Sequence, residues 1–142
     1  MATRQWRRAV AVSWLVVSGA GCTDGGQGAR PAVPGTVAVV IKALENPFFA
    51  TMRDGVAATV QANKAELRFS AAAGQQDTAG QASALESLGA ERAGCYVVNP
   101  INATNLIQPL THLRKGTPIV NIDSPVDQET AKALGVRMTA YV

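Results

Sequence analysis

Hydrophobic positions along the chain alternate between short continuous runs and stripes at helical spacing. Strands that are buried on both faces carry near-continuous apolar residues, so the short runs predict strands of a parallel sheet. These runs are residues 37–41, 67–71, 93–98, 118–122 and 136–142, of which the last reaches the end of the sequence. The intervening stretches have apolar residues three and four positions apart, which predicts amphipathic helices between the strands.

Local signals mark where these helices begin and end. Asn46 is expected to cap the first helix, with Pro47 at the first helical position, where its missing N–H group costs nothing. Further N-caps are predicted at Asp77 and Asn102, and glycines typical of helix ends stand at Gly89 and Gly116. Residues 128–134 predict a fourth, short helix.

Strands that are separated by helix-length connections form βαβ units. The pattern therefore predicts an α/β fold, a three-layer sandwich around a mostly parallel, doubly wound sheet of about five strands. Ligands of such sheets bind beyond the carboxyl ends of the strands. Polar and aromatic residues follow the first, third and fourth predicted strands, which makes them candidates for a binding site: Asn46, Phe48, Phe49, Asn99, Asp123 and Ser124.

The net charge of +3 on this 142-residue chain is concentrated at its beginning. Arg4, Arg7 and Arg8 precede the uncharged run 9–17, and without these three arginines ten basic residues face ten acidic ones. Binding of a polyanion needs Lys and Arg gathered on one surface. Because Arg114–Lys115 is the only basic pair in the remaining sequence, we expect no nucleic-acid partner.

The beginning of the chain has the organisation of an export signal. A basic segment, the apolar run 9–17 and small residues up to Gly21 predict a signal peptide over 1–21, and the apolar run is too short to span a bilayer. Two cleavage interpretations stand open. Residues 19–22 resemble a lipobox, which would make Cys22 the lipidated first residue, whereas Ser18-Gly19-Ala20 suits an ordinary signal peptidase.

The Gly- and Pro-rich stretch 22–36 predicts a flexible tether to a folded body over 37–142. Acylation of Cys22 would leave Cys95 as the single thiol, so we expect no intrachain disulfide and interpret Cys95 as a small buried hydrophobic residue. The signal predicts a periplasmic or extracytoplasmic location, with a lipid anchor on Cys22 as the chain's one contact with a membrane.

Three segments carry a resemblance to a known family: VIKALENPFFATMRDG at 40–55, YVVNP at 96–100 and PIVNIDS at 118–124. In this order they resemble the N-terminal lobe of type 1 periplasmic sugar-binding proteins of the ribose/galactose type, the solute receptors of ABC transporters. The resemblance implies that Asn46, Phe48, Phe49, Asn99 and Asp123 line a sugar cleft. Ser124 departs from the Arg that often stands at its position, which leaves the preferred sugar open.

Sugar chemistry suits these residues without the resemblance. A carboxylate at Asp123 can accept hydrogen bonds from two hydroxyl groups, and the Asn side chains can donate and accept. A phenyl ring covers a C–H face of a sugar. Plainer roles also fit: Asn46 as a helix cap, Phe49 as a core residue and Asn99 as part of a turn.

Lys42 and His112 are two further polar residues of the predicted body. Lys42, at the end of the first predicted strand, either reaches the cleft or is a solvated or salt-bridged residue. His112 is expected at the surface, and no acid or nucleophile is near it in the sequence.

Enzymatic function is not expected. A Gly-rich phosphate loop after the first strand and a His/Cys cluster with metal-ligand spacing are both missing from the sequence, so we expect neither cofactor nor metal. The predicted function is capture of a neutral monosaccharide or similar small polar ligand for an ABC transporter, with its permease as partner. The alternative is a sensory lobe that presents a sugar-like signal to a membrane sensor or chemoreceptor.

Because the sequence ends inside the fifth predicted strand, we expect an incomplete N-terminal lobe, a fragment that binds sugar weakly on its own.

Overall fold

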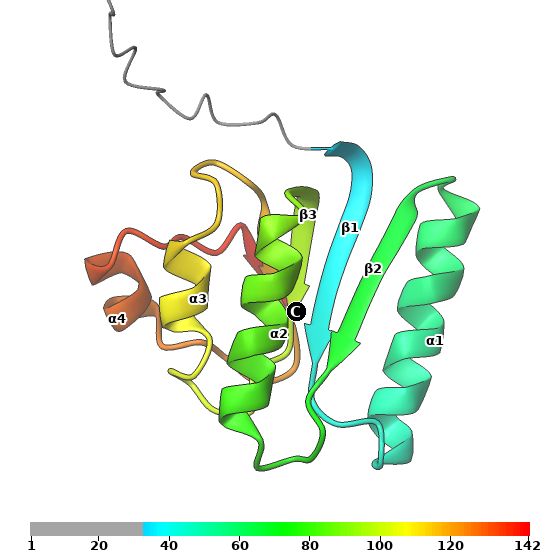
Figure 1. Ribbon diagram of the computed structural model, residues 1–142, viewed down its shortest axis with the longest axis horizontal. Coiled ribbons are helices and arrows are strands. Elements are labelled where there is room, and N and C mark those ends of the chain that lie inside the picture. Colours follow the sequence, from blue (N-terminus) through cyan, green and yellow to red (C-terminus); the bar gives the residue numbers. More distant parts are fainter. Residues whose placement is uncertain (1–32) are drawn as a thin grey trace, which may run out of the picture.

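A computed structural model describes residues 33–142, so the predicted signal peptide, the Cys22 anchor and residues 22–32 of the predicted tether lie outside the described residues. Five strands alternate with four helices (Figure 1). The elements are β1 (Val33–Ile41), α1 (Pro47–Ala62), β2 (Glu66–Ala71), α2 (Thr78–Ala90), β3 (Ala93–Val98), α3 (Ile107–Thr111), β4 (Ile119–Asn121), α4 (Gln128–Ala133) and β5 (Ala140–Tyr141).

The five strands form one sheet in the order β2-β1-β3-β4-β5, and every neighbouring pair is parallel. The predicted α/β class and parallel sheet are therefore confirmed. β1 begins at Val33, four residues before the predicted start of the folded body, so residues 33–36 belong to the sheet rather than to a tether. β1 and β3 are neighbours within the sheet. The connections from β1 to α1 and from β3 to α3 therefore begin next to one another at the carboxyl end of the sheet.

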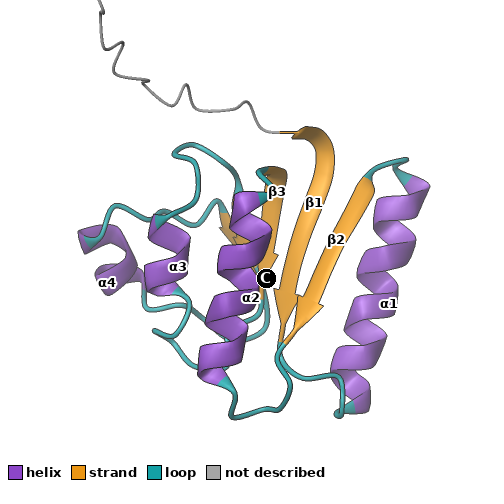
Figure 2. Ribbon diagram, viewed as in Figure 1, coloured by secondary structure: helices purple, strands orange, loops and turns teal. Residues whose placement is uncertain are grey.

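Helices cover both faces of the sheet, which confirms the three-layer arrangement (Figure 2). Successive strand residues point to opposite faces, and in β1 this places Val39 and Ile41 in a core with Phe49 of α1. Ala38 and Val40 belong to the larger core on the other face, together with Leu85 of α2 and residues of α3 and α4. The continuous apolar run of β1 thus serves two cores.

The first two helices begin where the sequence predicts. The Asn46 side chain accepts a hydrogen bond from the Phe48 N–H at 3.0 Å, and the Asp77 side chain accepts one from the Gly80 N–H at 2.8 Å. α2 extends one residue past the predicted end at Gly89. Strong capping residues directly before an apolar stripe therefore placed both helix starts correctly.

The third helix is much shorter than predicted, because it begins at Ile107 and not after Asn102. The Asn102 side chain instead accepts hydrogen bonds from the N–H groups of Thr104 and Asn105 and forms a separate turn. Pro109 has no N–H group, so an α-helix begun at 103 would lack a hydrogen bond in its interior at that point. The predicted cap at Asn102 is therefore wrong as a helix start. α3 also ends at Thr111, with His112 exposed as its C-cap, rather than at Gly116.

The last two strands are shorter than their apolar runs. β4 covers Ile119–Asn121, and within the predicted strand 136–142 only Ala140–Tyr141 pairs with β4. Val136 is buried, but it packs into the core shared with α2 and α3 instead of entering the sheet. The apolar run 136–142 therefore contains two separate features: a core residue after α4, Val136, and the short edge strand β5.

Cys95 is half-buried, which corrects its interpretation as a fully buried residue. It shares a face of β3 with the half-buried Val97, whereas Tyr96 and Val98 on the other face are buried completely. Even this partial burial raises the pKa of the Cys95 thiol. Within residues 33–142, no helix has the length and apolar character needed to cross a bilayer.

Candidate functional site

Three neighbouring strands bring polar side chains to the carboxyl end of the sheet. Lys42 follows β1 directly, Asn99 follows β3 directly, and Asp123 and Ser124 come just after β4. Since β1, β3 and β4 are adjacent in the sheet, these four residues meet, and we call them the carboxyl-end cluster. The predicted placement of candidate residues behind strand ends therefore holds for Asn99, Asp123 and Ser124.

Asp123 is the centre of this cluster, and all its side-chain contacts fall on one oxygen. Its Oδ2 accepts hydrogen bonds from Asn99 Nδ2 at 2.9 Å, Ser124 Oγ at 3.2 Å and Lys42 Nζ at 3.3 Å. Among the described residues, Oδ1 has no hydrogen-bond partner, and the side chain is 35% exposed. One oxygen is thus held by the protein, while the other has no partner among the described residues on a partly exposed side chain.

The backbone at Asp123 is held in an unusual conformation by the end of the chain. Its φ of +60° lies in the left-handed region, which non-glycine residues seldom enter and which Asp tolerates better than most. The Asp123 N–H donates to the carbonyl of Val142 at 2.9 Å, and the Tyr141 hydroxyl donates to the Asp123 carbonyl at 2.7 Å. β5 therefore fixes the turn that presents the carboxylate.

The surroundings of Asp123 keep it ionised. Partial burial would raise the pKa of this carboxyl, but hydrogen bonds from Asn99, Lys42 and Ser124, together with the Lys42 charge, outweigh burial and lower the pKa below its ordinary value of 3.8. A carboxyl whose pKa is lower in the folded state stabilises the fold at pH values above its unfolded pKa. That contribution is lost as the pH falls below 3.8 through the folded-state pKa.

Replacement of Lys42 by Met is expected to raise the pKa of Asp123, because it removes both a hydrogen bond and the nearest positive charge while burial remains. The shift can be measured by following the Asp123 carboxyl carbon in an NMR pH titration. Lys132→Met is the matched control, because Lys132 lies in the last turn of α4, away from the cluster. An equal Asp123 pKa in the two variants would show that Lys42 does not control its ionisation.

Asn99 is completely buried, and its hydrogen-bonding groups are used within the chain. Its Oδ1 accepts from the Lys42 N–H at 3.4 Å, and its Nδ2 donates to the Ile122 carbonyl at 3.1 Å as well as to Asp123. In this arrangement the Asn99 amide joins the ends of β1, β3 and β4. It holds the Asp123 carboxylate in position.

Two buried side-chain amides, which sequence reasoning missed, form hydrogen bonds to backbone groups of the cluster. Gln81 of α2 donates to the Asn99 carbonyl at 2.9 Å and accepts from the Ile101 N–H at 3.0 Å. Asn121 of β4 donates to the Ser124 carbonyl at 2.8 Å and accepts from the Val126 N–H at 2.7 Å. Both could have been found, because each is a polar residue on a buried face: Gln81 continues the stripe of Leu85 at helical spacing, and Asn121 interrupts an apolar strand.

The aromatic turn before α1 divides its two rings between core and surface. Phe49 is 6% exposed and belongs to the core, whereas Phe48 is 56% exposed. Their ring centroids lie 5.2 Å apart in an edge-to-face arrangement, and Lys42 Nζ lies 5.4 Å from the Phe49 centroid. Asn46 is half-buried, and its side-chain oxygen is occupied as the cap of α1. Of the two phenyl groups, Phe48 is therefore free to cover a ligand.

Lys42 has a larger part in the site than the sequence indicates. Its Nζ pairs with Asp123 across 81 residues of sequence and also contacts the Ser124 hydroxyl. Of the interpretations of Lys42, the salt-bridged one is confirmed, and its salt bridge lies within the carboxyl-end cluster. Sequence neighbours could not show this pair, because the two residues meet only when β1 and β4 flank β3.

The cluster offers hydrogen-bonding groups and an apolar ring at one end of the sheet. Among residues 33–142, no three His, Cys, Asp or Glu side chains are placed to hold a metal ion. The open Asp123 oxygen is an acceptor, the Lys42 ammonium is a donor, and the exposed Phe48 ring is an apolar surface at the same end of the sheet. Such a set can contact a small ligand that carries hydroxyl groups and C–H faces.

Comparison with known proteins agrees with this arrangement. Residues 37–141 match the family model described as "Periplasmic binding protein domain". The D-allose-binding periplasmic protein of Escherichia coli is 27% identical over 106 residues, and the D-ribose/D-allose-binding protein of Pseudomonas aeruginosa is 31% identical over 105. These matches cover 74% and 70% of this chain, which thus spans about a third of either relative, at 34% and 33%.

The fold itself recurs in solved structures. An ABC transporter periplasmic solute-binding protein from Actinobacillus succinogenes, solved with bound D-allose, superposes with a TM-score of 0.67 at 24% identity. The superposition covers 74% of this chain and 37% of that one.

Proposed function

The chain belongs to the periplasmic binding protein family, and from this premise we propose that it captures a neutral monosaccharide through its carboxyl-end cluster. The two curated relatives are named for binding D-allose, or D-ribose and D-allose, which makes aldoses of this kind the first candidates. The proposed role is binding for transport rather than catalysis. The proposed site residues are Asn46, Phe48, Phe49, Asn99, Asp123 and Ser124, to which we add Lys42. Of these, the buried Asn99 and Phe49 would hold their neighbours in position.

The open oxygen of Asp123 is the observation that carries this proposal. Oδ2 is already held by Asn99, Ser124 and Lys42, so the carboxylate is oriented before any ligand arrives, while Oδ1 is free to accept from a sugar hydroxyl. A hydrogen bond to a charged acceptor is stronger than one between neutral groups. An oriented carboxylate also loses little conformational entropy when it binds.

The charge balance of the cluster favours an uncharged ligand. The Lys42 ammonium lies 3.3 Å from the Asp123 carboxylate, so their charges compensate one another within the site. A sugar acid would meet the open carboxylate oxygen, and a cationic ligand would meet the Lys42 ammonium. A neutral sugar avoids both like-charge repulsions. Its hydroxyl groups can donate to Asp123 and accept from Lys42.

We propose that this lobe supplies one side of the sugar site. The relatives are about three times as long as the region that matches, so their remaining length is available for contacts on the other side of the ligand. On this proposal the lobe acts outside the cytoplasm, held to a membrane by lipidated Cys22, and delivers its sugar to the permease of an ABC transporter. With contacts from one side, we expect weak binding by the 142-residue chain alone.

Saturation-transfer NMR on the full chain tests the proposal, since it detects weak binding. D-allose and D-ribose are expected to receive magnetisation from the protein, and each should compete with the other for a single site. Glucuronate and glucosamine, which carry opposite charges, serve as matched controls and should give much weaker transfer. Transfer to neither aldose, or equal transfer to all four sugars, would contradict the proposed site.

A further inference from the structure

The balanced charge of the folded body conceals a separation of charge between its two ends. Residues 33–142 contain nine basic and nine acidic residues. The segments that lead from each helix into the next strand lie at the amino end of the parallel sheet, and they carry most of the positive charge. We call this surface the basic end, and its residues are Lys64, Arg92, Arg114, Lys115, Lys132 and Arg137.

Arg68 of β2 also belongs to this half, where it pairs with Glu66 and Glu91. These two glutamates are the acidic residues of the basic end, which leaves that end with a net charge of +5. No ion pair within 4.0 Å joins a described acidic residue to Arg114, Lys115, Lys132 or Arg137.

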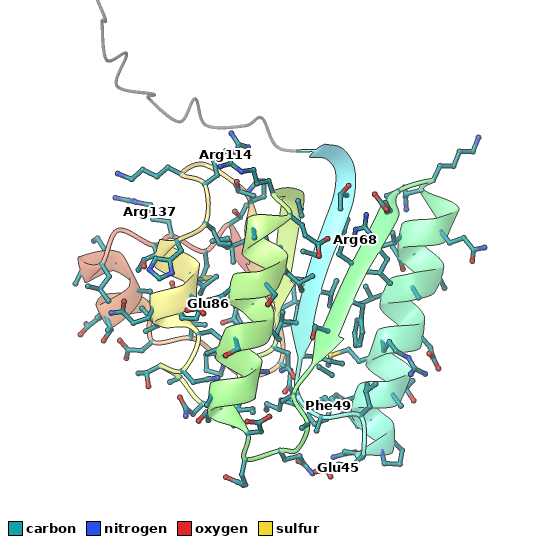
Figure 3. All side chains as sticks on the ribbon, in the orientation of Figure 1. Glu45, Phe49, Arg68, Glu86, Arg114 and Arg137 are labelled. Carbon is teal, nitrogen blue, oxygen red and sulfur yellow. The ribbon has the colours of Figure 1, made fainter. Side chains whose placement is uncertain are left out.

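The carboxyl end of the sheet has the opposite sign. It carries Lys42 and five acidic residues, Glu45, Asp77, Asp123, Asp127 and Glu129, for a net charge of −4. The remaining charged residues, Arg53, Asp54 and Glu86, lie midway along α1 and α2. Figure 3 shows the separation, with Arg114 and Arg137 at one end of the molecule and Glu45 with Phe49 at the other.

The basic end also contains a groove with an apolar floor. Its volume is about 430 Å³, and it lies between the end of α3, the segment that leads from α3 to the beginning of β4, and the segment 134–139 that joins α4 to β5. Arg114, Lys115 and Arg137 line it together with Leu110, Leu134 and Met138. Leu134 is 46% exposed, so an apolar side chain stands at the surface among the cations. Positive charge around exposed apolar groups is the composition of surfaces that rest on anionic lipid.

We propose that the basic end docks on an anionic phospholipid bilayer. The lipid phosphates would pair with Arg114, Lys115 and Arg137, and Leu134 would contact the acyl boundary. This inference uses no residue of the carboxyl-end cluster and does not depend on sugar binding. It differs from an anchor on Cys22, because it concerns the folded surface itself.

The place where the described chain begins favours a membrane over an acidic protein as occupant. Val33, the first residue of β1, lies at the basic end (Figure 1). Ten residues, 23–32, separate it in the sequence from Cys22, so a lipid anchor on Cys22 would hold this end close to a bilayer. Docking at this end would leave the carboxyl-end cluster pointing away from the bilayer, where a solute can reach it.

Vesicle binding by residues 22–142, the chain without its predicted signal peptide, tests this assignment, because the arginines and the apolar run of the signal would bind anionic vesicles themselves. Cys22→Ser is included in every protein so that no acyl chain contributes. Affinity is measured for vesicles of phosphatidylcholine alone and of phosphatidylcholine with phosphatidylglycerol. The parent should prefer the anionic vesicles, and the preference should decline in high salt. Arg114→Gln/Lys115→Gln/Arg137→Gln should weaken binding to the anionic vesicles by roughly 100-fold, at about fivefold for each basic residue lost near the surface.

The matched control is Gln75→Glu/Gln76→Glu/Gln128→Glu, which lowers the net charge by the same three units at the opposite end of the sheet, before α2 and at the start of α4. Its affinity for anionic vesicles should stay within about twofold of the parent. Equal losses in both variants would show that net charge alone acts and would overturn the proposal. Unchanged vesicle binding of the first variant would overturn it too, and if polyglutamate then retained the parent alone, the basic end would be assigned to an acidic protein segment.

Discussion

Asp123→Asn should reduce the affinity of the chain for D-allose or D-ribose by roughly 10- to 150-fold, which corresponds to about 1.5–3 kcal/mol for a hydrogen bond to a charged group. Asn keeps the shape of the side chain, but it removes the charge that orders Lys42, Asn99 and Ser124 around Oδ2. An NMR titration with the sugar measures the change. Because the parent itself binds weakly, we expect no detectable binding by the variant at the sugar concentrations that saturate the parent.

Asp54→Asn is the matched control for this prediction. Asp54 is 67% exposed in the middle of α1 and pairs with its neighbour Arg53, far from the carboxyl-end cluster. The control loses one carboxylate as the test variant does, so its sugar affinity should equal that of the parent. If the two variants bound sugar equally well, Asp123 would have no part in the site.

Asn121→Ala is expected to lower the free energy of unfolding by about 3 kcal/mol, the cost of leaving buried polar groups unpaired. Asn121 is completely buried, and its side chain bonds the Val126 N–H at 2.7 Å and the carbonyls of Ser124 and Val98 at 2.8 and 3.2 Å. Alanine would leave the Val126 N–H without its partner in the interior. Urea unfolding followed by circular dichroism measures the loss.

The exposed Asn63 provides the comparison for this variant. Its side chain bonds only the Thr59 carbonyl, one helical turn earlier, at the end of α1. Asn63→Ala should therefore cost less than about 1 kcal/mol. A similar small loss for Asn121→Ala would mean that water satisfies the groups around it, and the support given to the Asp123–Ser124 turn would be weaker than the hydrogen bonds indicate.

Signals that act between close sequence neighbours were enough to predict much of the fold. The cap at Asn46 with Pro47 placed the start of α1, and the apolar run 93–98 has the same bounds as β3. Parallel pairing followed from helix-length connections, and the parallel arrangement placed Asn99 and Asp123 at one end of the sheet. Local chemistry misled at Asn102, where the same capping side chain closes a turn and Pro109 keeps the helix short.

Contacts between distant segments could not be predicted in the same way. The Lys42–Asp123 pair joins residues 81 positions apart and depends on the order of β1, β3 and β4 in the sheet. The charge separation depends on the same geometry, because helices that return antiparallel to the strands deliver Arg114 and Arg137 to one end. A count of charged residues along the sequence shows only that basic and acidic residues are equal in number over 33–142. Polar residues on buried faces, such as Gln81, were the signal available for the supporting hydrogen bonds.

The central claim, that the carboxyl end of this sheet binds sugar, is tested most directly by mapping where the sugar binds. Amide NMR spectra of the full chain are recorded during a titration with D-allose. We predict that the shifts fall on the non-proline residues of 42–48, 99–101 and 123–125, and that those of 110–119 and 134–139 around the basic groove do not respond. Shifts gathered at the basic groove, or a spectrum unchanged by D-allose and D-ribose at high concentration, would contradict the proposed function.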